Sequence, residues 1–245
     1  MKNQLLLADI KHVLSSKRVS YSLVIMVFFA VLMAIIAEFS PAGLKDALES
    51  SAGSAGLFEY LWFEDALKFL LLIVVSFGAF IISDMEDEGT IQLVLAQPES
   101  RNSFLFRRII VSILTFTFVY SIGALLVGLI GGLVVGQLDL PLFLLHQLMI
   151  FPMCIFIIAL TFFFSVPIQS SAPTVLSSFG LSLVMSFTYS FSLMGDATVP
   201  SPYNPMAFGY RVIMDQPLAE PLIVILIAST ALFTAGILWF NKKDM

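Results

Sequence analysis

One short charged stretch has residue types suited to binding a partner. It reads Ile82-Ser-Asp-Met-Glu-Asp-Glu-Gly-Thr-Ile-Gln-Leu-Val-Leu-Ala-Gln-Pro-Glu-Ser-Arg101, with four acids in five residues near its start. Pro98 breaks the segment, and Ser100 is placed to cap a new helix that begins at Arg101. A solvated loop would explain the acids but not the apolar residues in its middle, which are Ile91, Leu93, Val94 and Leu95. A short apolar helix there needs a groove, either in the lipid interface or on a partner.

Residue patterns for catalysis or metal binding are weak by comparison. The two histidines are His12 and His146, and neither belongs to a metal-binding spacing such as H-E-x-x-H. No G-x-x-x-x-G-K-[ST] sequence occurs, so any ATP that drives this protein must be bound by another chain. An intramembrane serine hydrolase stays a minor alternative, which depends on His146 facing a serine within the bundle.

The composition is that of a membrane protein. Of the 245 residues, 59% are hydrophobic and 12% are charged, whereas roughly 25% of a soluble domain is charged, and the mean hydropathy is +0.98. A bilayer core about 30 Å thick is crossed by roughly 20 apolar helical residues. The apolar runs predict six spans, at residues 19–37, 67–83, 109–135, 143–166, 175–194 and 221–240.

The predicted fold class is therefore an all-α membrane protein with six transmembrane helices. Backbone groups in hydrocarbon must bond internally, and no run shows the alternation typical of a barrel strand. No repeat divides the chain, so residues 1–245 are expected to form one transmembrane domain.

The basic residues are distributed unevenly about these spans. Nine would lie in the cytoplasm and three outside if the N-terminus is cytoplasmic, which the positive-inside rule favours. Both termini are then expected in the cytoplasm. The nine are Lys2, Lys11, Lys17, Arg18, Arg101, Arg107, Arg108, Lys242 and Lys243, and the three are Lys45, Lys68 and Arg211. Arg107 and Arg108 are expected to anchor the third span at the interface.

The segments between the spans also carry patterns. Residues 1–18 have apolar positions at helical spacing, which predicts an amphipathic helix in the cytoplasmic interface. The outer loop 195–220 is rich in proline, and its apolar part, 206–214, predicts a short re-entrant helix. The acidic outer segment 38–65 is expected to be a solvated loop, with contact to a cationic substrate or an extracytoplasmic partner as the alternative.

The spans themselves offer few groups for chemistry. They contain almost no ionisable residue, which argues against coupling to protons or sodium. Gly128, Gly132 and Gly136 recur every four residues in the third span and make one helix face smooth. We expect this face to pack against another helix of the chain, with a dimer interface as the alternative.

The charged stretch resembles the segment between the second and third spans of type-2 ABC transporter permeases. That family shows acidic residues, then G-T-[LI], an apolar pair, and a Pro-x-Ser-Arg ending. The matching residues are Glu86, Asp87, Glu88, Gly89, Thr90, Ile91, Val94, Leu95, Ala96, Pro98, Ser100 and Arg101. Met85 departs from the family's leading glutamate, and Glu99 from its small apolar residue. The interfacial helix, the six spans and the short outer helices extend the resemblance along the chain.

The resemblance implies a mechanism and a set of partners. Residues 84–108 would hold a coupling helix that docks on a separate ATPase, with Ile91, Val94 and Leu95 in apolar contact and the charged residues in polar pairing. Two ATPase chains, which bind ATP and Mg, and a second permease chain, identical or related, would complete an exporter in the cell membrane. No cofactor is expected in this chain. The alternative function is a scaffold or force-transmitting subunit that docks an ATPase without moving a solute.

Overall fold

The computed structural model describes residues 9–11, 13–39, 41, 56–63, 67–89, 100–136, 138–168, 170–194, 204–205, 208, 211–212 and 217–242. Within these residues the regular structure is helical and includes no strand, which confirms the all-α class. Four described helices are long and apolar enough to cross a membrane, namely α2 (Lys17–Phe39), α8 (Arg101–Val135), α9 (Leu140–Ile168) and α12 (Ala219–Lys242). They coincide with the first, third, fourth and sixth predicted spans.

The other two predicted spans fall on α5 (Leu67–Ala79) and α10 (Ser171–Met194). Their described apolar stretches, Leu70–Ala79 and Ser171–Phe187, are shorter than a full span. The number six therefore remains a prediction, while a helical bundle with several spans is confirmed.

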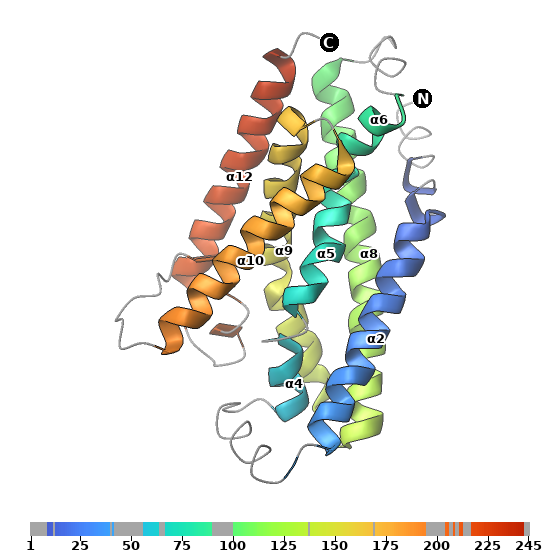
Figure 1. The fold of residues 1–245 in the computed structure, drawn as a ribbon, viewed down its shortest axis with the longest axis vertical. Helices are drawn as coiled ribbons and strands as arrows, with labels where there is room; N and C mark the ends of the chain where they lie inside the picture. Colours follow the sequence, from blue (N-terminus) through green and yellow to red (C-terminus); the bar gives the residue numbers. More distant parts are fainter. Residues whose placement is uncertain are drawn as a thin grey trace.

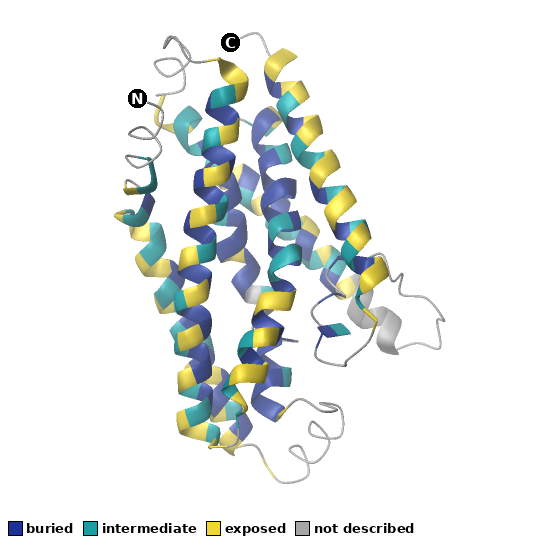
Figure 2. Cartoon of the chain, turned by 180° about the vertical axis from the view of Figure 1, so that it is seen from behind, coloured by how far each residue is buried: buried dark blue, intermediate teal, exposed yellow. Residues whose placement is uncertain are grey.

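Helix α9 lies at the centre of the bundle. It contacts α5, α8, α10 and α12, whereas α2 packs mainly along α8 (Figure 1). In its most apolar 18-residue window 67% of the residues are buried, against 17% in that of α12. Figure 2 shows exposed positions along the outer sides of the surrounding helices. Large apolar side chains are among the exposed residues of these helices, and Phe28, Phe118 and Ile227 are more than half exposed. This arrangement gives lipid chains an apolar surface to contact.

Several helix ends lie together at one end of the bundle. The start of α2, the start of α8, the end of α12 and the short helix α6 (Ser83–Asp87) all lie there (Figure 1). Asn241 Nδ2 donates to Asn102 Oδ1 at 2.6 Å, which joins α12 to α8. The start of the first span and the end of the last span thus lie on the same side of the bundle, as an even number of crossings requires.

The structure corrects two boundaries around α5. The helix stops at Ala79, and residues 80–82 form a turn, although the apolar run led to a predicted span end at residue 83. Before α5, helix α4 (Leu57–Leu61) is buried, so a fully solvated loop over 38–65 is wrong for residues 57–63. Phe58, Leu61 and Trp62 explain this burial, because removing their large apolar side chains from water lowers the free energy of the folded chain.

The predicted interfacial and re-entrant helices are described only in part. Residues 9–11 and 13–14 are helical, and Val13 is 1% exposed, but residues 1–8 and 12 lie outside the described residues. In the outer loop, residues 208 and 211–212 are helical, with Phe208 and Val212 buried, and most of 195–216 lies outside the description. Both helices remain predictions.

The three spaced glycines of α8 have different surroundings. A Cβ on Gly128 would lie 2.5 Å from Leu140 Cδ1, so this glycine allows α9 to approach closely. A Cβ on Gly132 would have no neighbour within 4 Å in the described part of the chain, and Gly136 ends the helix with φ +72°. Gly128 therefore packs within the chain, while the dimer alternative for this face stays a prediction.

We predict that Gly78→Ala destabilises the bundle. A Cβ there would lie 2.5 Å from Thr161 Cβ and 3.0 Å from the carbonyl oxygen of Ile158, and neither atom is at the end of a flexible side chain. Separating α5 from α9 should cost about 1 to 3 kcal/mol, measured as a lower thermal midpoint in detergent.

Gly180→Ala is the matched control, because a Cβ at Gly180 would have no atom of the described residues within 4 Å. Its higher helix propensity should leave the stability unchanged or raise it by up to about 1 kcal/mol. Equal midpoints for the two variants would contradict the close α5–α9 contact.

Candidate coupling site

The end of α5 is held by an arginine from α8. Arg108 is 6% exposed, and its Nη2 donates to the carbonyl oxygen of Phe80 at 2.7 Å. Its Nε donates to the carbonyl of Ile81 at 3.4 Å, and the guanidinium lies 3.8 Å from the centroid of the Phe80 ring. A cation at a helix C-terminus satisfies carbonyls that have no partner within the helix and complements the helix dipole.

A second α8 side chain acts in the same way one turn further along. Ser112 Oγ donates to the carbonyl of Phe77 at 2.6 Å. The prediction that Arg108 anchors the third span at the membrane surface is therefore wrong, because its guanidinium is buried against α5. Arg107 does face the end of the bundle, where its Nε donates to Asp9 Oδ2 at 2.9 Å.

Beyond this turn, α6 begins the charged stretch and its first acid binds α2. Asp84 forms an ion pair with Arg18, which lies in the first turn of α2. Arg18 also lies 5.5 Å from the centroid of the Phe80 ring. The Phe80 ring therefore contacts two cations, one from α2 and one from α8, and cation–π attraction adds to the hydrogen bonds.

The third acid of the stretch binds α10. Asp87 Oδ2 accepts from the backbone N–H of Ser171 at 2.8 Å and from the Ser171 hydroxyl. Ser171 is the first residue of α10, where an N–H has no helical partner, so Asp87 caps a distant helix. These bonds from Ser171 lower the pKa of Asp87 from its ordinary 3.8. Ser83 Oγ also lies 3.1 Å from Thr174 Oγ1, a second contact between α6 and α10.

The remaining motif residues lie before, within and after residues 90–99, which the structure does not describe. Gly89 follows α6 with φ +66°, a conformation that glycine adopts without strain. Ser100 Oγ accepts from the backbone N–H of Ser103 at 3.3 Å, which confirms it as the N-cap of α8, and Arg101 is the first residue of that helix. Glu86 is partly buried on α6, and Glu88 is exposed after it. Thr90, Ile91, Val94, Leu95 and Pro98 lie outside the described residues, so their docking role is a prediction.

A comparison with known protein families shows to which family this chain belongs. A family model described as ABC-2 family transporter protein matches residues 15–193, well over half of the chain. The chain belongs to the ABC-2 transporter family. A search of curated proteins found no match. The ABC-2 permease is thus a multi-pass membrane subunit that works in transport, and the family associates with ABC ATPases rather than carrying the ATPase itself.

Sequence reasoning missed a buried polar pair near the opposite end of this ABC-2 permease. His146 Nδ1 of α9 lies 2.5 Å from Glu59 Oε1 of α4, and both side chains are at most 5% exposed. Glu59 was expected in a solvated loop, so nothing in the sequence pattern linked it to His146. In the described part of the chain, the hydrogen bond found for the His146 ring goes to a carboxylate, which lends the hydrolase alternative no support.

We predict that Arg108→Gln destabilises the ABC-2 permease more than Arg107→Gln. Removing the Arg108 guanidinium leaves buried carbonyls without a charged donor, and such a bond contributes about 1.5 to 3 kcal/mol. The ion pair of Arg107 is partly exposed, so its loss should cost about 1 kcal/mol or less. Thermal midpoints of both variants in detergent test this order, and a larger shift for Arg107→Gln would refute the role given to Arg108.

We predict that Asp87→Asn reduces the loss of stability in acid. The pKa of Asp87 is lowered in the folded state, so its carboxylate stabilises the fold above its ordinary pKa of 3.8. That contribution disappears as the pH falls below 3.8 and through the lowered value. Thermal midpoints of the parent and the variant, measured from pH 6 to pH 3, should therefore converge toward the acid end. A constant difference between them would show that the contact does not depend on the carboxylate charge.

Proposed function

We propose that this ABC-2 permease is the membrane subunit of an exporter, driven by a separate ATPase that docks on residues 84–108. The observation that carries the proposal is the position of α6, which begins the docking segment and bonds to two other helices. Asp84 pairs with Arg18 of α2, and Asp87 caps α10 through Ser171. A shift of α6 on docking would therefore act directly on both helices.

The ATPase supplies the energy in this mechanism. Two ATPase chains bind ATP and Mg, and their closure moves the docked segments of two permease chains, identical or related. A ligand shifts a conformational equilibrium only through its different affinity for the two states. The apolar residues Ile91, Val94 and Leu95 give the docking contact, while Asp84 and Asp87 pass the displacement to α2 and α10. The positive-inside distribution of Lys and Arg supports a cytoplasmic position for this end of the bundle.

The experiment separates docking from transmission. The chain is co-expressed with an ABC ATPase from the same genome, and retention of the ATPase and its ATP turnover are measured after reconstitution in lipid. Leu95→Asp with Arg101→Ala should lose the ATPase, because a carboxylate would be buried in an apolar contact. Lys242→Ala, at the exposed end of α12 on the same side of the bundle, is the control and should retain it.

We predict that Asp84→Asn keeps the ATPase bound but lowers the ATP turnover that the permease stimulates. Loss of a partly exposed ion pair worth about 1 kcal/mol corresponds to roughly a fivefold change. Equal turnover in Asp84→Asn and the parent would remove α6 from the transmission path. Failure of the ATPase to associate with the parent chain would instead favour a function without this partner.

A further inference from the structure

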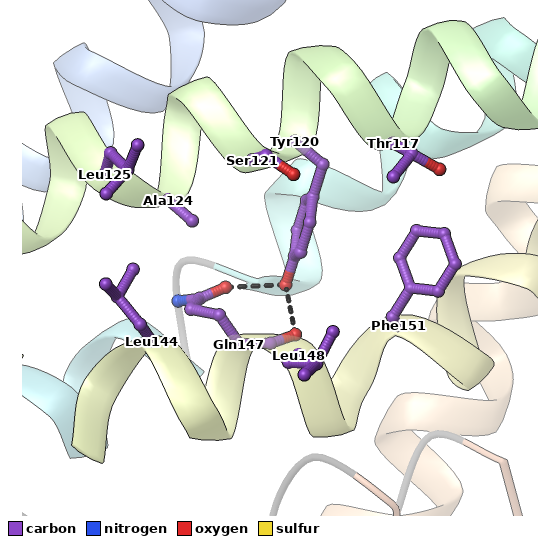
Figure 3. A pocket seen from close by; sticks show the side chains of 9 residues that line it. All are labelled: Thr117, Tyr120, Ser121, Ala124, Leu125, Leu144, Gln147, Leu148 and Phe151. Carbon is purple, nitrogen blue, oxygen red and sulfur yellow. Dashed lines mark hydrogen bonds between the residues drawn. The ribbon is translucent and has the colours of Figure 1, made fainter. Parts of the chain in front are cut away.

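A cavity of about 260 Å³ lies between α8 and α9, away from the coupling site. Its lining comes from residues 117–125 of α8 and residues 144–151 of α9, and the side chains converge on it from both helices (Figure 3). An engineered apolar cavity of about 150 Å³ already binds benzene, so this one has room for a larger organic group.

The cavity has one fixed polar feature. Tyr120 Oη donates to Gln147 Oε1 at 2.5 Å and lies 3.3 Å from the Gln147 carbonyl oxygen. This bond occupies the amide oxygen and sets the orientation of the amide (Figure 3). Gln147 is 2% exposed, and its buried Nε2 has no hydrogen-bond partner among the residues that the structure describes. Burying an amide N–H without an acceptor is costly, so a ligand that supplies one recovers that cost.

The rim of the cavity faces the bilayer. Leu125 and Leu148 are 47% and 68% exposed and lie on the lipid-facing sides of α8 and α9. Leu144 and Phe151 add apolar surface, and two hydroxyls, those of Thr117 and Ser121, also line the cavity. The Thr117 hydroxyl donates to the carbonyl of Ile113 in its own helix. None of the nine lining residues, all within the described helices, carries a charge. A ligand therefore enters from lipid, and its polar group is uncharged.

We propose that this cavity binds an uncharged acyl group whose carbonyl oxygen accepts a hydrogen bond from Gln147 Nε2 while its chain contacts Leu125, Leu148 and Phe151. The ester-linked chain of a bilayer lipid and an acylated cargo share this chemistry. The site does not depend on ATPase docking, since its residues lie on α8 and α9, outside residues 84–108.

The test compares two lipids that differ only in the carbonyl. The complex of permease and ATPase is reconstituted with diacyl or with dialkyl-ether phosphatidylcholine, and retained lipid is counted by native mass spectrometry after mild delipidation. The parent should retain the diacyl lipid about fivefold better, the ratio expected of one hydrogen bond worth about 1 kcal/mol. Gln147→Leu should remove this preference, and equal retention of the two lipids by the parent would overturn the proposal.

A second pair of variants tests the cavity independently of its amide. Ala124→Phe places a ring in the cavity and should abolish retention, whereas Leu145→Phe, on an exposed position of α9 outside the lining, should leave it unchanged. Undiminished retention in Ala124→Phe would place the lipid elsewhere. ATP turnover distinguishes the two sources, because a cargo leaves the complex during turnover and a resident lipid stays.

Discussion

The hydrogen bonds from Arg108 to the end of α5 determine how the rest of the coupling site is arranged. A helix that ends within a bundle leaves carbonyl groups that neither lipid nor apolar side chains can satisfy. Arg108 and Ser112 supply donors to the carbonyls of Phe80, Ile81 and Phe77, so α5 can stop at Ala79 and turn. The turn at residues 80–82 then gives α6 its direction. Asp84 reaches α2 and Asp87 reaches α10 as a result.

The buried acidic and basic side chains among the described residues each have a partner. Arg108 faces two carbonyls and an aromatic ring, and Glu59 meets His146. Desolvating an unpaired ion in such a place would cost a large part of the stability of a typical domain, whereas a well-bonded pair nearly breaks even. The scarcity of ionisable residues in the spans and the close pairing of the few that are buried have the same physical cause. The Glu59–His146 pair also joins the short helix α4 to the central helix α9.

Local features could be predicted from the sequence, and long-range pairings could not. Hydropathy located the main helices, and Ser100 was recognisable as an N-cap because the capping bond reaches only three residues along the chain. Glu59 and His146 are 87 residues apart, and no periodicity connects them. The sequence prediction treated Arg107 and Arg108 alike, because two adjacent arginines give the same positive-inside signal. Hydropathy and charge do not show that only the second guanidinium turns inward toward α5. The end of α5 was missed because Phe80, Ile81 and Ile82 are as apolar as the helix before them. Hydropathy does not reveal where an apolar segment stops being helical and turns.

The strengths of the contacts around α6 indicate how force would spread through the bundle. Arg108 is buried and makes charge-assisted bonds, so the end of α5 should stay fixed to α8. The contacts of α6 are more exposed: the side chains of Arg18 and Asp84 are 31% and 14% exposed, and the Asp87 bond to Ser171 is also exposed. Helices α2 and α10 flank α5 (Figure 1). A partner that displaced α6 would therefore rotate it about residues 80–82 and pull on both flanking helices. Coupling energies of about 1 to 3 kcal/mol are usual in allosteric proteins, and surface contacts of this kind can be broken and reformed within that range.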